Sequence, residues 1–175
     1  MHTCPRGLAS VSGVLLALAL TATASRGDDW PRLLGPMQNS HSAETNLLLH
    51  WPDEGPPFLW RRALDTGFSP PVVAQGTVIA FYRKADEEIV EGLDAVTGAP
   101  RWRFTYASHY VDRYGFNGGP RSAPTIEGQR VYTLGAEGTL SCLTLDKGDL
   151  LWQRRVNEEF GVQQNFFGVG VSPLI

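Results

Sequence analysis

The residue types best suited to binding gather in one stretch between Trp102 and Ser122. Tyrosine and arginine dominate binding hot spots because they combine a large contact area with directional hydrogen bonds. We therefore predict a binding loop in this stretch, with five contact residues: Arg121, Tyr110, Tyr114, Asp112 and Asn117. The alternative is a packed surface loop whose tyrosines cover a neighbouring part of the fold.

Patterns typical of catalysis or metal binding are weak. His41, His50 and His109 share no spacing that would bring them to one metal ion. The acidic run from Asp86 to Glu88 is more typical of a solvated turn than of a calcium loop. No glycine-rich loop leads into a helix, and His109 has no assignable partner for a Ser–His–Asp arrangement. We therefore predict no metal site and no catalytic residue in this chain.

A tight hairpin precedes the predicted loop and would position it. Asp94 can accept hydrogen bonds from backbone N–H groups two or three residues on. Thr97 supplies a second turn hydroxyl, and Gly98 the positive φ that closes the turn. Trp102 then begins the return strand with a large apolar surface.

The same hairpin frame recurs 50 residues later, with Gly148 and Trp152 at the matching positions. Thr144 and Lys147 replace the aspartate and threonine, so the hairpin is expected there without the aspartate turn bond. We expect Trp102 and Trp152 each to be largely buried between adjacent repeats.

Around the hairpins, short β-branched and aromatic segments are separated by tight turns. Four-strand units over 69–106 and 122–156, at a period of about 50 residues, are typical of β-propeller blades. Phe58–Ala63 is predicted to be an additional outer strand, and Ser172 to open a further unit. The predicted fold is therefore all-β: a β-propeller of four-stranded antiparallel blades over residues 58–175, present as an incomplete arc of about two full blades plus partial ones.

The first hairpin resembles the tryptophan-docking motif of pyrroloquinoline-quinone-like (PQQ-like) repeats, Ala-x-Asp-x-x-Thr-Gly-Lys-x-x-Trp. Gly92 and Ala99 depart from this motif. The matching positions, which the resemblance implies are blade-docking residues, are Asp94, Thr97, Gly98 and Trp102, with Gly148 and Trp152 in the second copy. The opening Asp29-Trp30-Pro31 is also similar to the start of exported bacterial proteins of this kind. The resemblance implies a ring of about six to eight blades, so we expect an N-terminal fragment whose ring a missing C-terminal part completes.

Strand parity places both long crossings between blades on one face of the disc. Arg121 directly precedes an innermost strand, so its guanidinium could reach the mouth of the central channel and hold a carboxylate or phosphate there. The alternative is that Arg121 pairs with an acidic residue of the next blade and ties the ring together.

The N-terminal sequence predicts a targeting segment followed by an irregular arm. Residues 1–24 combine a basic start, a short apolar run and a small-x-small site, as in a cleaved signal peptide. Residues 25–57 are rich in proline and polar residues, and we expect an irregular arm pinned to the domain by Trp30 and Trp51. The protein is therefore predicted to be exported, periplasmic or secreted, with no membrane span after cleavage.

Charge and cysteine content favour some classes of function over others. The chain has a net charge of −3 and no Lys/Arg cluster, which argues against a nucleic-acid partner. We expect a non-catalytic scaffold that binds a protein or envelope polymer through its long-loop face, without a cofactor. The resemblance implies one alternative, a PQQ-dependent dehydrogenase with bound calcium whose catalytic residues lie in missing blades. That enzyme family often uses adjacent cysteines, whereas Cys142 stands alone after residue 24 and is expected to be buried.

Overall fold

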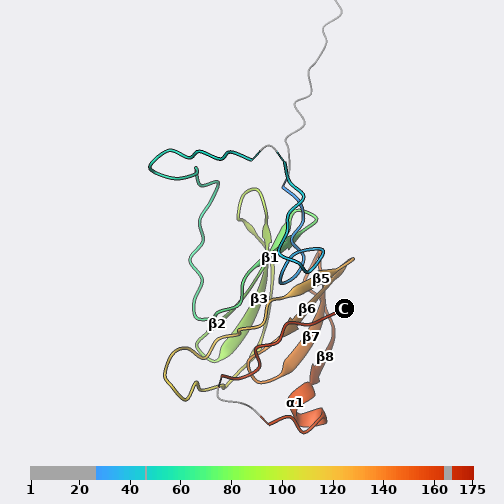
Figure 1. Ribbon diagram of the computed structural model, residues 1–175. Helices are drawn as coiled ribbons and strands as arrows, with labels where there is room; N and C mark the ends of the chain where they lie inside the picture. Colours follow the sequence, from blue (N-terminus) through green and yellow to red (C-terminus); the bar gives the residue numbers. More distant parts are fainter. Residues whose placement is uncertain (1–26, 46, 164–166) are drawn as a thin grey trace, which may run out of the picture.

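The computed structural model describes residues 27–45, 47–163 and 167–175, so the predicted signal peptide lies outside the described residues. Two four-stranded antiparallel sheets make up the fold, each with its strands in sequence order (Figure 1). We call them blade 1 and blade 2. Blade 1 comprises β1 (Val72–Ala74), β2 (Thr77–Lys84), β3 (Glu87–Asp94) and β4 (Pro100–Ala107). Blade 2 comprises β5 (Thr125–Glu127), β6 (Arg130–Leu134), β7 (Thr139–Thr144) and β8 (Leu150–Arg155), and the single turn α1 (Val156–Glu159) follows it. The predicted all-β blade architecture is confirmed.

The main hydrophobic core lies between the two blades. In β4, alternate side chains turn toward blade 2, and Trp102, Phe104 and Tyr106 belong to this core or pack against it. Ile126 and Leu143 contribute from blade 2. The period-two alternation of β4 is what a strand shows when only one of its faces is covered by another sheet.

The connections separate onto two opposite faces, as strand parity predicts. The short β1–β2 and β3–β4 turns lie at one end of the strands, and the long crossing 108–121 and α1 lie at the other (Figure 1). We call the second end the loop face. Backbone bonds join its parts: the amide of Ser108 donates to the Asp86 carbonyl, and that of Val169 donates to the Ala136 carbonyl.

The N-terminal arm spans the innermost strands of both blades. Trp30 exchanges two backbone hydrogen bonds with Val73 of β1, at 2.8 and 3.0 Å, and the Pro31 carbonyl accepts the Ile126 amide of β5 at 2.8 Å. Arg32 adds an ion pair to Glu127. Trp30 therefore anchors the arm as predicted, whereas Trp51 is exposed and its predicted anchoring role is wrong.

The predicted strand at Phe58–Ala63 does not form. Alternate side chains still face blade 1, with Trp60 and Arg62 half-buried and Leu59 and Arg61 exposed. No described strand pairs with this segment, and its nearest ladder contact is an isolated bridge between Thr66 and Arg83. A segment with strand alternation therefore remains without a strand partner among the described residues.

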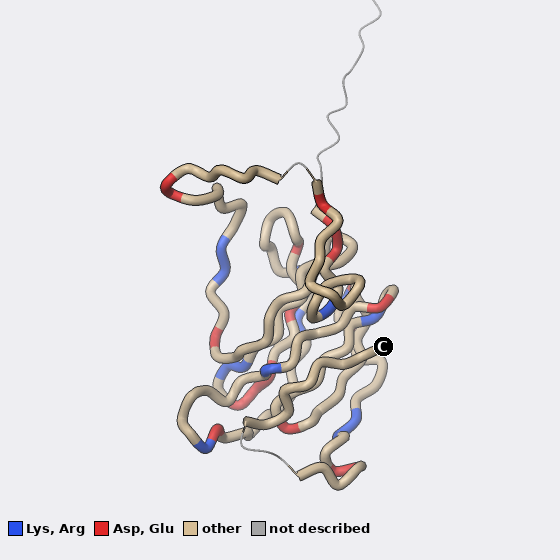
Figure 2. The backbone as a smooth tube through the Cα atoms, in the orientation of Figure 1, with Lys and Arg blue, Asp and Glu red and all other residues tan. Residues whose placement is uncertain are grey.

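Charged residues of both signs are interspersed along the chain in both blades (Figure 2). Within the described residues, no helix has the length and apolar character needed to cross a bilayer.

Candidate binding face

The first hairpin turn is closed by Asp94, as predicted. Its Oδ1 accepts the backbone amides of Val96 at 3.0 Å and Thr97 at 2.8 Å, together with the Thr97 hydroxyl at 2.9 Å. Arg101 donates to the other carboxylate oxygen at 2.6 Å. The Arg101 hydrogen bond and the turn bonds hold the pKa of Asp94 well below its usual range. In the second turn, Thr144 Oγ1 accepts the Asp149 amide at 3.1 Å, so the hairpin persists without the aspartate.

Trp102 joins the two blades. Its indole Nε1 donates to the Leu145 carbonyl of blade 2 at 2.9 Å, and its ring lies against Gly148. Trp60 contacts the hairpin turn of blade 1 in the same way. Its Nε1 donates to the Ala95 carbonyl at 3.0 Å, and its ring lies against Gly98. Each tryptophan therefore docks on the hairpin glycine of the next unit along the arc.

Trp152 does not follow this pattern. Its exposed fraction is 39%, against 8% for Trp102, so the prediction of burial is confirmed for Trp102 and wrong for Trp152. No described blade packs against β8, and the ring of Trp152 contacts Tyr132 of its own blade instead. The motif therefore places a tryptophan at the docking position, but the side chain becomes buried only where a neighbouring sheet packs against it.

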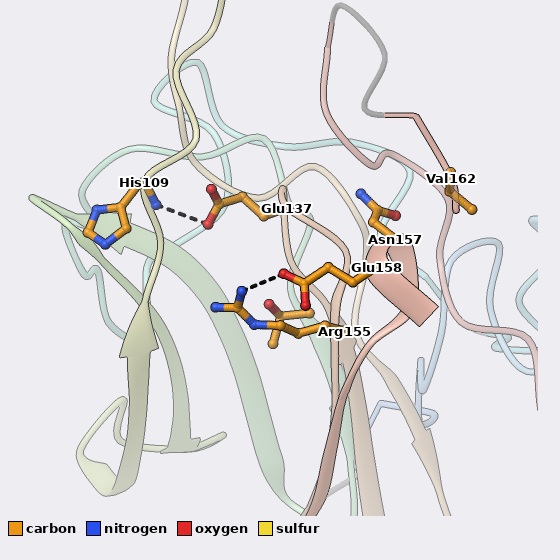
Figure 3. A pocket seen from close by; sticks show the side chains of 7 residues that line it. His109, Glu137, Arg155, Asn157, Glu158 and Val162 are labelled. Carbon is orange, nitrogen blue, oxygen red and sulfur yellow. Dashed lines mark hydrogen bonds and ion pairs between the residues drawn. The ribbon is translucent and has the colours of Figure 1, made fainter. Parts of the chain in front are cut away.

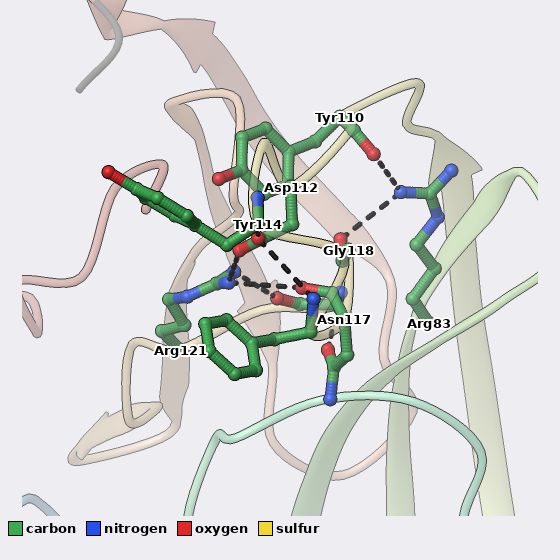
Figure 4. Close-up of polar contacts among 9 residues, drawn as sticks. Arg83, Tyr110, Asp112, Tyr114, Asn117, Gly118 and Arg121 are labelled. Carbon is green, nitrogen blue, oxygen red and sulfur yellow. Dashed lines mark hydrogen bonds and ion pairs between the residues drawn. The ribbon is translucent and has the colours of Figure 1, made fainter. Parts of the chain in front are cut away.

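The crossing 108–121 is organised around an ion pair between Arg121 and Asp112 (Figure 4). The two side chains meet at 2.6 Å, and Arg121 also donates to the carbonyls of Asn117 and Gly119 at 3.0 Å. Asp112 Oδ1 accepts the Tyr114 amide at 2.9 Å, and the Asn117 side chain accepts the Gly119 amide at 2.9 Å. Arg121 is thus committed inside its own loop, rather than reaching toward the channel or pairing with an acid of the next blade.

Arg83, at the end of β2, fixes the other side of this crossing. Its guanidinium donates to the carbonyls of Tyr110, Gly118 and Ala85 at 2.5, 3.1 and 2.7 Å. The Tyr110 ring is buried beside Arg121, and burial raises the pKa of its phenol although Arg121 opposes the shift. Arg83 was not among the predicted residues, although a buried arginine near the end of an otherwise apolar strand could have marked it.

Tyr114 is the one predicted contact residue whose side chain is mostly exposed, at 59%. Its ring stacks on Phe167 at a centroid distance of 5.7 Å and lies 6.4 Å from the ring of Phe116. Phe116 and Phe167 are also exposed. We call these three side chains the aromatic patch. Tyr110, Asp112, Asn117 and Arg121 form the frame beneath it, so the structure separates the five predicted residues into one surface group and four framework groups.

A second feature of the loop face is a crevice of about 350 Å³ between the crossing and α1 (Figure 3). The Arg155–Glu158 ion pair lines it at 2.7 Å, and the His109 backbone amide donates to Glu137 at 3.0 Å. Both side chains of this ion pair are exposed, so the crevice is lined by charged groups in contact with solvent.

Comparison with known proteins places this architecture in a family. A family model described as outer membrane protein assembly factor BamB matches residues 43–167, which is more than half of the chain. The chain belongs to this family of PQQ-like repeats. No curated protein gives a significant match.

Solved structures similar to this PQQ-like chain come from more than one functional class. BamB from Moraxella catarrhalis has 28% identity and a TM-score of 0.33, over 46% of this chain and 20% of that one. The quinohemoprotein alcohol dehydrogenase of Comamonas testosteroni has 23% identity and a TM-score of 0.42, over 61% and 15%. A europium-containing methanol dehydrogenase has 21% identity and a TM-score of 0.36, over 48% and 14%. The chain thus spans a fifth or less of each of these proteins.

Within the described part of this PQQ-like chain, no group of three or more histidine, cysteine or acidic side chains converges. Cys142 is buried as expected, and burial raises the pKa of its thiol.

Proposed function

We propose that this chain belongs to an exported, non-catalytic β-propeller scaffold that binds a protein partner through the aromatic patch of its loop face. The observation that carries the proposal is the patch itself, which combines Tyr114, Phe116 and Phe167 on a frame closed by the Arg121–Asp112 ion pair. Exposed aromatic groups clustered on a soluble fold commonly mark contact sites.

The frame beneath the patch favours binding. The bonds from Arg83 and Arg121 fix the loop backbone before a partner arrives, which reduces the ordering entropy lost on association. The family description names an assembly factor for outer membrane proteins, which supports a protein partner. The predicted signal peptide over residues 1–24 supports export.

The test places a photo-crosslinking amino acid at Tyr114 in the full-length protein and identifies the adducts by mass spectrometry. We expect one dominant envelope protein to couple at this position. The matched control is the same amino acid at Val96, an exposed residue of the β3–β4 turn at the opposite end of the strands, where that adduct should be absent.

Equal adducts at both positions, or none at Tyr114, would overturn the proposed binding face. A separate measurement addresses the scaffold assignment: the absorbance spectrum of full-length protein after addition of the quinone and Ca²⁺. A stoichiometric bound-quinone spectrum would contradict a non-catalytic role, whereas we expect the spectrum of free quinone.

A further inference from the structure

A basic pocket lies on the side of blade 1 that faces away from blade 2. Its volume is about 460 Å³, and three chain segments form it: residues 62–65, β2 and β4. The cationic side chains at its rim are Arg62, Lys84 and Arg103. In β4, Arg103 alternates with Trp102, so it projects away from the core between the blades.

A buried carboxylate holds the two arginines. Glu91 is 1% exposed, and both of its oxygens accept from Nη2 of Arg62 at 2.7 and 2.8 Å. Arg103 Nη2 donates to Glu91 at 3.1 Å, and the Tyr82 hydroxyl donates to it at 3.2 Å. Burial is the largest cause of the raised pKa of Tyr82, so its phenol stays protonated and remains a donor. Two guanidinium groups are therefore fixed in place before any ligand arrives.

The cations of this pocket keep unused hydrogen-bond donors. Three carboxylates lie near the three cations: Asp65, Glu91 and Glu87, which lies opposite Lys84 in the β2–β3 pair. Glu91 is saturated by the bonds above, and Asp65 Oδ1 accepts the Thr66 amide at 3.0 Å. Arg103 uses only Nη2 in its described bonds, and the described residues offer the Lys84 side chain no ion pair. The N–H groups of Arg103 outside Nη2 therefore remain unused on a side chain that Glu91 already holds in place.

The geometry points to a carboxylate-binding site formed by Arg62, Lys84 and Arg103. Guanidinium N–H groups suit the two oxygens of a carboxylate. Ala63 and Leu64 also line the pocket, so apolar side chains adjoin the charged ones. The carboxylate can come from an acidic side chain of a polypeptide or from a free organic acid, and both sources share the same recognition chemistry.

The test follows the arginine Nε–H signals of the full chain by nuclear magnetic resonance during titration with sodium acetate, against sodium chloride at constant ionic strength. We expect saturable shifts at Arg62 and Arg103. Arg101 is the internal control, because it lies two residues from Arg103 on the same strand and is already bonded to Thr77 and Asp94. Equal, non-saturating shifts at Arg101 and Arg103 would overturn the proposal.

Two lysine variants distinguish a defined site from nonspecific charge attraction. Lys84→Gln should weaken acetate binding about five-fold, as expected for loss of one partly exposed charge pair. Lys147→Gln makes the same charge change at the only other lysine of the chain, in the turn of blade 2, and should leave binding unchanged. Equal effects of the two substitutions would show only nonspecific charge attraction and contradict a defined site.

A blocked peptide with one glutamate among aliphatic residues distinguishes the two sources. Tighter binding of this peptide than of acetate, together with shifts of the Ala63 and Leu64 amides, assigns the site to a polypeptide segment. Equal affinity assigns it to a free acid. The aromatic patch lies outside this pocket, so failure of the acetate titration would leave the proposed function unaffected, and failure of crosslinking at Tyr114 would leave the pocket unaffected.

Discussion

Blades 1 and 2 share strand order and hairpin register but treat their docking tryptophans differently. Trp102 lies opposite Gly92 in the β3–β4 pair, and Trp152 lies opposite Cys142 in the β7–β8 pair. A Cβ at Gly92 would come within 2.3 Å of the Trp102 indole, so the missing side chain makes room for the ring. In blade 2 the cysteine occupies that place. Burial of the motif tryptophan thus depends on the residue opposite it and on the sheet beyond it.

The largest expected effect separates the two tryptophans. Trp102→Ala should lower the free energy of unfolding by about 3–5 kcal/mol, because it removes a buried aromatic group and leaves the Leu145 carbonyl without its donor. Trp152→Ala should cost about 1 kcal/mol in this chain, the usual size for a partly exposed side chain. Urea denaturation of both variants measures the difference. Equal losses would show that position in the motif, rather than the neighbouring blade, sets the contribution.

A smaller effect is expected at the glycine on which Trp102 docks. Gly148 has a φ of 71°, and a Cβ there would meet the Trp102 ring at 2.3 Å. Gly148→Ala should therefore cost about 2–3 kcal/mol, from left-handed backbone strain and displacement of the ring.

Gly128→Ala provides the control for this substitution. Gly128 has a φ of 56°, but nothing lies within 4 Å of its added Cβ. It should show only the backbone cost, about 1 kcal/mol. Indistinguishable melting curves for the two variants would mean that the Trp102–Gly148 contact contributes nothing to the junction between the blades.

The smallest effect concerns pH at that junction. Glu88 of blade 1 accepts hydrogen bonds from Tyr106 and from the Ala136 amide of blade 2. Burial nevertheless raises its pKa above the usual 4.5. The folded state therefore binds this proton more tightly than the unfolded chain does, and stability falls as the pH rises from below 4.5 through the folded-state pKa.

Glu88→Gln should remove this dependence. The wild type should lose stability over that pH window and the variant should not. The difference in melting temperature, variant minus wild type, should therefore increase over the window and then level off. Glu87→Gln changes the same charge at the neighbouring position and serves as the control, with a smaller change expected because its side chain is exposed. A difference between Glu88→Gln and wild type that is constant with pH would contradict the raised pKa.

The blades were predictable because their signals are local. Asp94, Thr97 and Gly98 close their turn within a few residues, so a short motif carries the information. The strand predicted at Phe58–Ala63 shows the opposite case. Its alternation is visible in the sequence, but strand formation requires a pairing partner, and the described residues supply none.

The candidate site was located by sequence but not resolved into roles. The binding loop predicted from its Tyr and Arg content does lie on the long-loop face, yet composition could not separate Tyr114 on the surface from Arg121 in the frame. Arg83 reaches its carbonyl acceptors 27 and 35 residues along the chain, which no local pattern encodes. The stacking of Tyr114 on Phe167 likewise joins two different crossings.

The N-terminal arm has a consequence for the order of assembly. Arg32 and its partner Glu127 are 95 residues apart, and the arm also bonds to β1 and β5. The arm precedes both blades along the chain, but half of its docking site exists only after β5 has been synthesised. Local hairpins form early, whereas contacts between distant residues carry a larger loop-closure cost and form late. The arm is therefore made before the blades but is among the last segments to reach its final place, and until then the inner edges of β1 and β5 remain open to other chains.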